Sequence, residues 1–198
     1  YPALSGIVPT GLNEDFFNER YFYDTDLAKK YLDKYLKKDK NKTLEISVVT
    51  DAQYLDVLEF IQSELKKLNI NLKIQITPPS ILRQGKAKGK YDFFRASWIA
   101  DYPNPENYFD LFSSKNKTPN GPNYTYFMNE KYDSIHNSLR SVQSDIKKSF
   151  EILENIIYDF SPIIPLYYDM SIRLINDNII DMSSNAINML DLEEVKKL

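Results

Sequence analysis

One stretch of the sequence, residues 44–76, restricts the folds open to this chain of 198 residues more than any other. Residues 44–48 alternate apolar and polar side chains, as a half-buried strand does, and residues 70–76 repeat that alternation. Apolar residues at helical spacing lie between them: Leu58, Ile61, Leu65 and Leu68. Thr50 and Gln53 have the spacing of a capping box for that helix. A strand, a helix and a strand in this order predict a right-handed crossover between parallel strands.

Helical spacing of apolar residues predicts three further helices, which would begin at the capping residues Thr25, Asn129 and Ser144. The last two helices would bury these side chains: Tyr132, Ile135, Leu139, Val142, Phe150, Leu153, Ile157 and Phe160. A short polar helix is expected from Pro79 to about residue 88, and another over residues 106–112.

Three further strands are predicted. Residues 91–99 are expected to form a buried strand that ends near Asp101, and residues 163–168 and 172–175 to form two strands joined by a turn. Residues 181–198 are polar and only weakly patterned. The order of all these elements predicts an α/β fold with a mixed sheet flanked by helices.

Composition excludes several classes of function. The net charge is -3, and the basic residues are dispersed among acidic ones, so no nucleic-acid partner is expected. The absence of cysteine removes disulfides, thiolate metal sites and cysteine nucleophiles. No apolar run approaches the ~20 residues needed to cross a bilayer. His136 is the only histidine and has no second histidine to share a metal, so an ordinary core or surface role is expected for it.

The segment from residue 91 to residue 107 carries the clearest chemical signal. It places Trp98, the only tryptophan, near the carboxyl end of a predicted strand, where open α/β sheets leave a crevice for ligands. Arg95 and Asp101 have opposite charges and lie six residues apart. Together they are suited to hold the two ends of a zwitterion. This pattern predicts a binding site for a short peptide.

Each of these residues also has a purely structural interpretation. Asp101 could close the strand as an Asx turn, Arg95 could pair with a neighbouring carboxylate, and Trp98 could belong to the core. In a different class, Asp101 could join Glu106 and Asp110 as the acidic residues of a carbohydrate hydrolase, although no spacing sets two of them across a bond. A protein-interaction module is a third possibility, which upstream sequence would decide. No catalytic residue, cofactor or metal site is predicted, because no nucleophile elbow, phosphate loop or zinc motif is present.

The same segment resembles a landmark of the peptide, oligopeptide and nickel cluster of solute-binding proteins that serve ABC importers. The landmark combines Arg95, Trp98 and Ala100-Asp101-Tyr102 with the Pro-Asn-Pro-Glu-Asn run that follows. Further similarities occur in order along the chain: residues 6–11, Tyr23-Asp24, residues 28–32, residues 123–133 and residues 162–168. The resemblance therefore spans nearly the whole chain.

The resemblance implies a role for each residue of this segment. Asp101 would hold the free amino terminus of a peptide, and Arg95 would be a candidate for its carboxylate at one ligand length. Tyr102 would support the loop of Asp101. Backbone groups for the peptide main chain, and the wall of a side-chain pocket, would come from Trp98, Ile99 and Ala100. Nickel, haem and sugar binders share this scaffold.

The resemblance also implies one lobe of a two-lobed periplasmic binding protein-like fold. Residues 1–180 would be the second ligand-binding lobe, and residues 181–198 a tail that returns to a first lobe absent from this chain. The protein would be a monomer that binds short peptides outside the cytoplasm, in the periplasm or as a membrane-anchored lipoprotein. It would deliver them to the permease of an ABC transporter, with no cofactor and no enzymatic activity.

Overall fold

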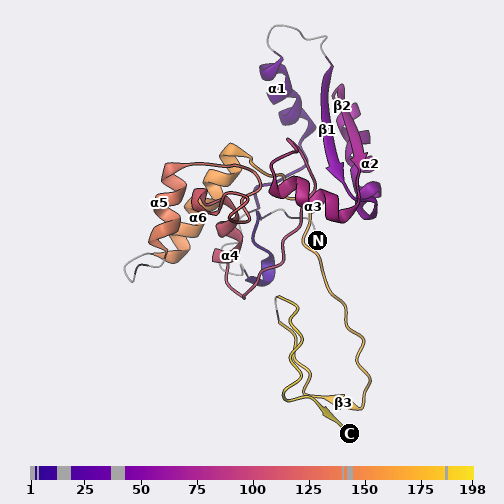
Figure 1. Ribbon diagram of the computed structural model, residues 1–198, viewed down its shortest axis with the longest axis vertical. Helices are drawn as coiled ribbons and strands as arrows, with labels where there is room; N and C mark the ends of the chain where they lie inside the picture. The colour runs from indigo at the N-terminus through magenta and orange to yellow at the C-terminus, as the bar shows by residue number, and fades with distance from the viewer. Residues whose placement is uncertain are drawn as a thin grey trace. The chain divides into compact units, whose positions relative to one another are not determined.

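The structure is a computed structural model that describes residues 3, 5–12, 19–36, 43–139, 141, 145–185 and 187–198 (Figure 1). The chain divides into two compact units. The first unit consists of the described residues of Tyr1–Phe22, Trp98–Asn116 and Thr125–Leu198. The second consists of those of Tyr23–Ser97 and Lys117–Tyr124. The division into a lobe of residues 1–180 and a tail of residues 181–198 stays a prediction.

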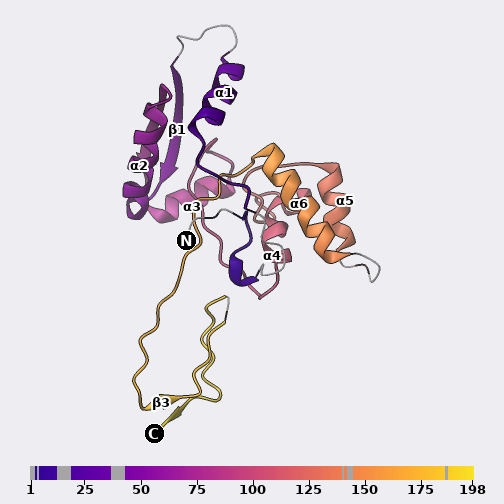
Figure 2. The same cartoon turned by 180° about the vertical axis from the view of Figure 1, so that it is seen from behind.

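The second unit contains the predicted strand, helix and strand. Strands β1 (Leu44–Thr50) and β2 (Ile70–Ile76) pair in parallel, with Leu44 opposite Ile70 and Thr50 opposite Ile76. Helix α2 (Leu55–Lys66) connects them and lies along one face of the pair (Figures 1 and 2). Their apolar faces meet in a small core: Val48, Leu58 and Leu72 are buried, and Ile46, Ile61, Leu65 and Ile74 pack around them. The parallel crossover is confirmed.

Two other helices of this unit are α1 (Thr25–Tyr35) and α3 (Pro79–Ala87), and both were expected. The capping residues differ from the prediction by one position. The Asp24 carboxylate accepts a hydrogen bond of 2.8 Å from the backbone N–H of Leu27, so it caps α1 in place of Thr25. Asp51 accepts from the N–H of Gln53 at 3.1 Å and caps the 3-10 turn η2 (Ala52–Tyr54), which precedes α2; α2 itself has no side-chain cap. Thr50 cannot cap because it is the last residue of β1 and is fully buried.

The predicted strand over residues 91–99 is wrong beyond its centre. Only Phe94 pairs with β1, through an isolated parallel bridge to Val49. The N–H of Val49 donates to the carbonyl of Phe93 at 3.1 Å, and the N–H of Arg95 donates to the carbonyl of Val49 at 2.9 Å. The expected burial is wrong as well, because none of residues 91–99 is fully buried, and side-chain hydrogen bonds hold the later part of this segment.

Residues 163–168 and 172–175 form no regular strand in the structure: Tyr167 makes a single isolated bridge, and the N–H of Ala3 donates to the carbonyl of Leu166 at 3.2 Å. Their apolar side chains are largely exposed, with Leu174 at 97% and Ile172 at 78%, so no apolar face is buried that would fix a strand register. The described residues contain a second, antiparallel pair further along the chain, β3 (Ile179–Ile180) with β4 (Lys196–Lys197). The α/β class is confirmed, and the parallel and antiparallel pairings belong to two separate two-stranded sheets.

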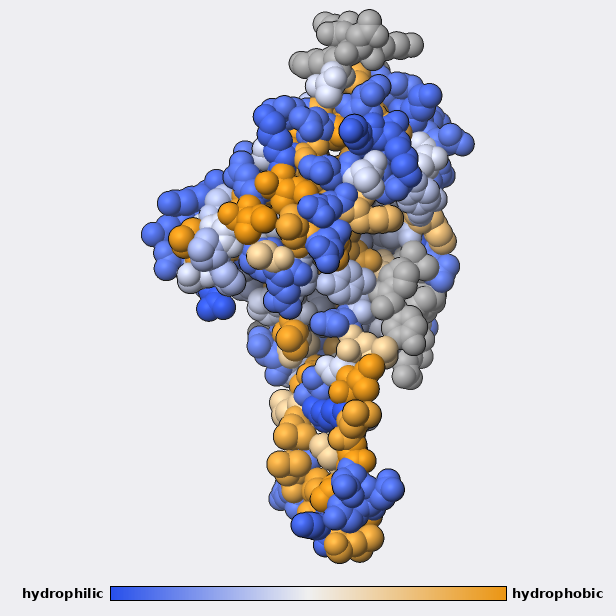
Figure 3. Space-filling view, turned by 90° about the vertical axis from the view of Figure 1, so that its right-hand side faces the viewer, coloured by the Kyte–Doolittle hydropathy of each residue, from blue (hydrophilic) through white to orange (hydrophobic). Residues whose placement is uncertain are grey.

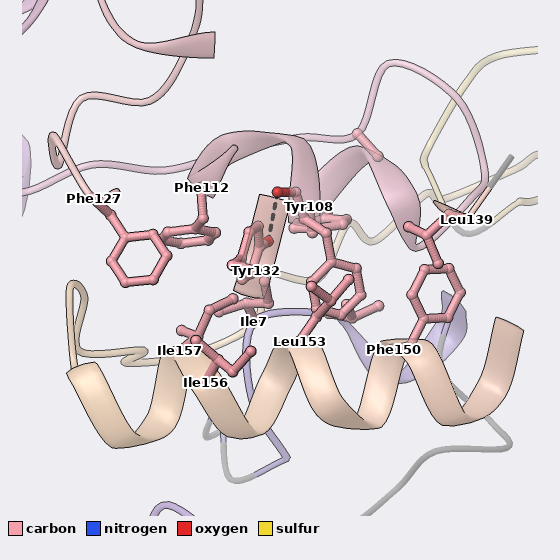
Figure 4. Packing of buried hydrophobic residues seen from close by; sticks show 13 residues of the cluster. Ile7, Tyr108, Phe112, Phe127, Tyr132, Leu139, Phe150, Leu153, Ile156 and Ile157 are labelled. Atoms are coloured by element: carbon pink, nitrogen blue, oxygen red, sulfur yellow. Dashed lines mark hydrogen bonds between the residues drawn. The ribbon is translucent and has the colours of Figure 1, made fainter. Parts of the chain in front are cut away.

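The first unit is built around helix α6 (Ile146–Phe160), whose apolar face carries the core (Figure 4). Helix α5 (Glu130–Ser138), the short helix α4 (Glu106–Phe109) and the 3-10 turn η3 (Asp110–Phe112) pack against it. Phe109 and Phe150 stack with ring centroids 5.0 Å apart. The Tyr132 hydroxyl donates to the carbonyl of Phe109 at 2.7 Å, which ties α5 to α4. The expected helix over residues 106–112 is therefore present as α4 followed by η3.

Helices α5 and α6 are each capped by a side-chain oxygen that accepts a hydrogen bond from a backbone N–H of the first turn. Asn129 accepts a hydrogen bond from the N–H of Tyr132 at 2.9 Å, which confirms its predicted role. Helix α6 is capped by Asp145, which accepts from the N–H of Lys148 at 3.2 Å. Ser144 and Val142, named in the sequence prediction, lie outside the described residues. In the part of the chain that is described, no helix combines the length and apolar character that a membrane span requires.

Candidate ligand-binding site

The loop that carries Asp101 is held from behind by helix α4. Asn107 is 4% exposed, and its side-chain oxygen accepts two hydrogen bonds. One comes from the indole Nε1 of Trp98 at 2.8 Å, and the other from the backbone N–H of Asp101 at 3.2 Å. A single buried amide oxygen thus fixes both the tryptophan ring and the start of the acidic loop.

Tyr108, the next residue of α4, holds the middle of the same loop. Its side chain is buried and has a hydrogen bond with the backbone of Ala100, which is 6% exposed. Burial raises the pKa of the Tyr108 hydroxyl, and the Ala100 backbone bond opposes part of that rise. Ala100 is therefore packed inward beside the helix.

Side chains on the other side of this loop face solvent. Ile99 is 76% exposed and Asp101 is also exposed. The Asp101 carboxylate makes no hydrogen bond or ion pair with the described residues of its own unit. An Asx turn would require this carboxylate to accept a nearby backbone N–H, so that structural role is not observed. Trp98 is half-buried and packs against the core of the first unit.

Tyr102 follows the acidic residue and lies against η3. Its hydroxyl donates to Oδ2 of Asp110 at a long 3.5 Å. The other carboxylate oxygen of Asp110 lies 3.0 Å from Nε2 of His136. Tyr102 thereby links the loop of Asp101 to α5.

Arg95 belongs to the second unit, apart from the other five predicted site residues. Its guanidinium carbon lies 3.1 Å from the centroid of the Tyr54 ring, and Nη1 lies 3.4 Å from the hydroxyl of Ser97. No ion pair joins it to a carboxylate among the described residues of that unit. Burial lowers the pKa of Lys86, repulsion from Arg95 and Arg83 lowers it further, and the charge of Asp51 opposes this shift. Lys86 thus lies within electrostatic reach of Arg95.

The sequence interpretation missed Asn107 and Tyr108, the two residues that hold the loop. Both were part of the recognised segment or adjoined it, yet neither was given a role. One signal was available: an amide side chain beside two aromatic residues on a short helix is often buried and therefore needs a hydrogen-bond partner.

A surface hollow of about 490 Å³ lies elsewhere in the first unit. It is lined by Glu19, Arg20, Phe22, Glu151, Asn155 and Tyr158. None of the predicted ligand residues contributes to it. The loop of Asp101 is thus no part of this hollow.

An α/β chain with an exposed acidic loop braced by a buried helix has the arrangement expected of a binding domain. A family model described as "Bacterial extracellular solute-binding proteins, family 5 Middle" matches residues 2–120. The match covers more than half of the chain, so the chain belongs to the bacterial extracellular solute-binding proteins of family 5. The family resemblance seen in the sequence is confirmed.

Curated relatives extend the similarity towards the end of the chain. The oligopeptide-binding protein OppA of Bacillus subtilis is 28% identical over 180 residues, which cover 84% of this chain and 32% of OppA. The dipeptide-binding protein DppE of the same organism is 24% identical over 177 residues, which cover 86% of this chain and 32% of DppE. The chain thus spans about a third of the length of these relatives.

Solved structures show the same fold. An OppA of Haemophilus influenzae in complex with the peptide RPPGFSPFR superposes with a TM-score of 0.79 at 18% identity, covering 98% of this chain and 40% of that one. An OppA of Burkholderia pseudomallei gives a TM-score of 0.78 at 20% identity, covering 100% of this chain and 40% of that one. The α/β fold is therefore that of part of a solute-binding protein.

Proposed function

We propose that this chain is the second lobe of an extracytoplasmic peptide-binding protein, in which Asp101 holds the free amino terminus of a short peptide. The observation that carries the proposal is the exposed Asp101 carboxylate, which has no partner among the described residues of its unit although the backbone around it is fixed by Asn107 and Tyr108. A rigidly positioned charge without an internal partner is suited to an external cation.

The neighbouring residues suit the rest of a peptide. Ile99 exposes its apolar side chain beside the acidic loop, and it can form one wall of a side-chain pocket. The backbone of residues 98–100 would bind the peptide main chain, which is common to all sequences. Binding would therefore depend weakly on the side chains of the peptide, since watered pockets accept many of them. Two relatives carry names that describe oligopeptide and dipeptide binding, and this supports a peptide ligand.

A second lobe that completes the site is supported by exposed apolar side chains over residues 170–192. Hydrophobic side chains gather over the segment that carries β3 and β4 (Figure 3). Among the described residues of this part of the chain, the exposed apolar side chains include Met170, Ile172, Leu174, Met189, Leu190 and Leu192. Apolar surface of this extent usually marks an interaction site. In this proposal it packs against the first lobe.

Capture would then proceed by closure of two lobes on the ligand. A ligand stabilises a closed form only by contacting it better than the open form, so both lobes must touch the peptide. Delivery to an ABC transporter permease would follow, with the protein acting as a monomer in the periplasm or at the membrane as a lipoprotein. No covalent step is part of this mechanism.

A carbohydrate hydrolase is the competing proposal from another class. It would need two carboxylates placed across a glycosidic bond, with one of them protonated. Glu106 and Asp110 instead lie with His136 in one cluster, and the Asp101 carboxylate has no partner among the described residues of its unit. A turnover assay with glycans and peptides separates the two proposals, because steady product formation would contradict a binding role.

Replacing Asp101 by alanine tests the peptide proposal in the protein that contains both lobes. Calorimetry should show loss of peptide binding, while the thermal stability without ligand barely changes because the side chain is exposed and unpaired in its unit. Asp159 is an exposed acidic residue on α6 and provides the matched control, since Asp159→Ala should leave the affinity unchanged. Unchanged affinity in Asp101→Ala would defeat the assignment.

A further inference from the structure

Three potential metal ligands lie together in the first unit, on α4, η3 and α5. Glu106 and Asp110 are one helical turn apart on α4 and η3, and His136 projects from α5. One ligand atom from each lies within 4.8 Å of the other two. The first two residues are half-buried and the histidine is buried.

His136 has an unusual environment for a buried histidine. It is 1% exposed and its ring stacks on Tyr132, with the centroids 6.1 Å apart and the planes at 11°. Nε2 lies within ion-pair distance of Oδ1 of Asp110, at 3.0 Å, whereas Nδ1 makes no hydrogen bond with the described residues. Buried polar atoms nearly always have a partner, and this buried imidazole faces two carboxylates that lie within reach of the same cation.

We propose that Glu106, Asp110 and His136 form a binding site for a divalent transition-metal ion of the zinc type. Imidazole nitrogen and carboxylate oxygen are both ordinary zinc ligands, at bond lengths of about 2.0–2.2 Å. Two ligands at such distances are about 3 Å apart at a right angle and about 3.4 Å apart in a tetrahedral site, so the 3.0 Å between Nε2 and Oδ1 is at the short end of this range. Calcium and magnesium prefer sites made of oxygen alone, so the histidine selects against them.

The position of this site gives it a structural consequence. Asn107 and Tyr108, which hold the loop of Asp101, lie between the two carboxylate ligands on the same short helix. A bound ion would join α4 and η3 to α5 and so restrain the helix behind the loop. The site itself does not depend on what the loop binds.

The geometry also limits the expected affinity. Metal-bound histidines usually donate their second ring N–H to an acceptor, and loss of that support weakens metal binding about 10- to 100-fold. Nδ1 of His136 has no such acceptor among the described residues. We therefore expect reversible zinc binding that strong chelators remove.

Zinc titration of the 198-residue chain, purified without a histidine tag, tests the proposal. The chain has one histidine and no cysteine, so any nitrogen ligand from an imidazole must be His136. Competition with a zinc-binding chromophore should show one equivalent bound. Zinc-edge X-ray absorption should show one imidazole among oxygen ligands, and magnesium in excess should not compete.

Three variants assign the ligands. His136→Gln should weaken zinc binding by at least ~10-fold, and so should Glu106→Gln and Asp110→Asn. The last two side chains are half-buried, so they keep the test decisive if the buried histidine variant does not fold. Asp159→Asn is the control and should bind zinc as the unchanged chain does. Absence of saturable zinc binding, or equal affinity in all ligand variants, would overturn the proposal without affecting the peptide site.

Discussion

Glu154 lies on α6 with only 7% of its surface exposed, and its Oε1 accepts a hydrogen bond of 2.9 Å from the backbone N–H of Ile7. The adjoining Gly6 has φ +127°, and a side chain there would overlap the Glu154 carboxylate. Burial raises the pKa of Glu154 to about 7, while the Ile7 hydrogen bond and the charge of Arg20 oppose the rise. This single carboxylate is therefore protonated in the folded chain at pH values where it is ionised in the unfolded chain.

The sign of the resulting pH dependence follows from the raised pKa. Below the ordinary value of 4.5 both states are protonated, and between 4.5 and about 7 only the folded state keeps the proton. Stability is thus lost as the pH rises through this window, by up to about 3 kcal/mol. Urea unfolding at pH 4.5 and pH 8 should show this loss for the unchanged chain, and Glu154→Gln should remove most of it. Identical pH dependence in the two proteins would contradict the assigned pKa.

Among the elements, helix α4 has the clearest link between packing and the site. Asn107→Ala would leave the Trp98 Nε1 and the Asp101 N–H without their acceptor. Because two donors lose their shared acceptor, the substitution should lower the free energy of unfolding by about 1–3 kcal/mol. Trp98 is the only tryptophan, so its fluorescence measures both unfolding and the change around the ring. An unchanged spectrum and stability would show that Asn107 does not hold the loop.

The β1–α2–β2 unit allows a matched test of its core. Leu72 is 1% exposed on β2, whereas Ile76 on the same strand is 54% exposed. Leu72→Ala should therefore destabilise the chain by about 2–5 kcal/mol, through lost burial and a residual cavity. Ile76→Ala should have a much smaller effect. Equal losses in urea unfolding of the two variants would be inconsistent with this strand register.

The sequence predicted those elements that depend on a pattern of adjacent residues. Its predictions were wrong where contacts between residues distant in the sequence determine the backbone conformation. Alternation in β1 and β2 and the helical repeat of α2 are properties of a few adjacent residues. Residues 91–99 have an equally strand-like composition, but hydrogen bonds from Trp98 and Asp101 to Asn107 hold their later part and the residues that follow. Asp24 caps α1 in place of the adjacent Thr25 because both residue types suit that position, and Asp51 caps the turn η2 that precedes α2.

The same distinction applies to the candidate sites. Asp101 could be singled out because its neighbours in sequence form a recognisable motif. The grouping of Glu106 and Asp110 with His136 could not, since only the packing of α5 on α4 and η3 brings them together. A lone histidine gives no sequence signal for a metal when the other ligands are carboxylates.

At the scale of the whole molecule, the proposed mechanism requires both lobes to contact the bound peptide. The 198-residue chain alone should then bind peptides weakly or not measurably, because the contacts from the first lobe are missing. Calorimetry with the same peptide on this chain and on the two-lobed protein makes the comparison. Equal affinity in both would show that closure of a second lobe contributes nothing to binding.

The pairing of Asp101 with a peptide amino terminus is tested most directly by changing both partners. In the two-lobed protein, calorimetry would compare a short peptide with its N-acetylated form, on the unchanged sequence and on Asp101→Asn. Leaving one charge of a buried pair unpaired costs roughly 3–5 kcal/mol, so each single change should weaken binding by about 100- to 1,000-fold or more. The two changes together should cost little more than either alone. Tight binding of the free peptide by Asp101→Asn would contradict the account.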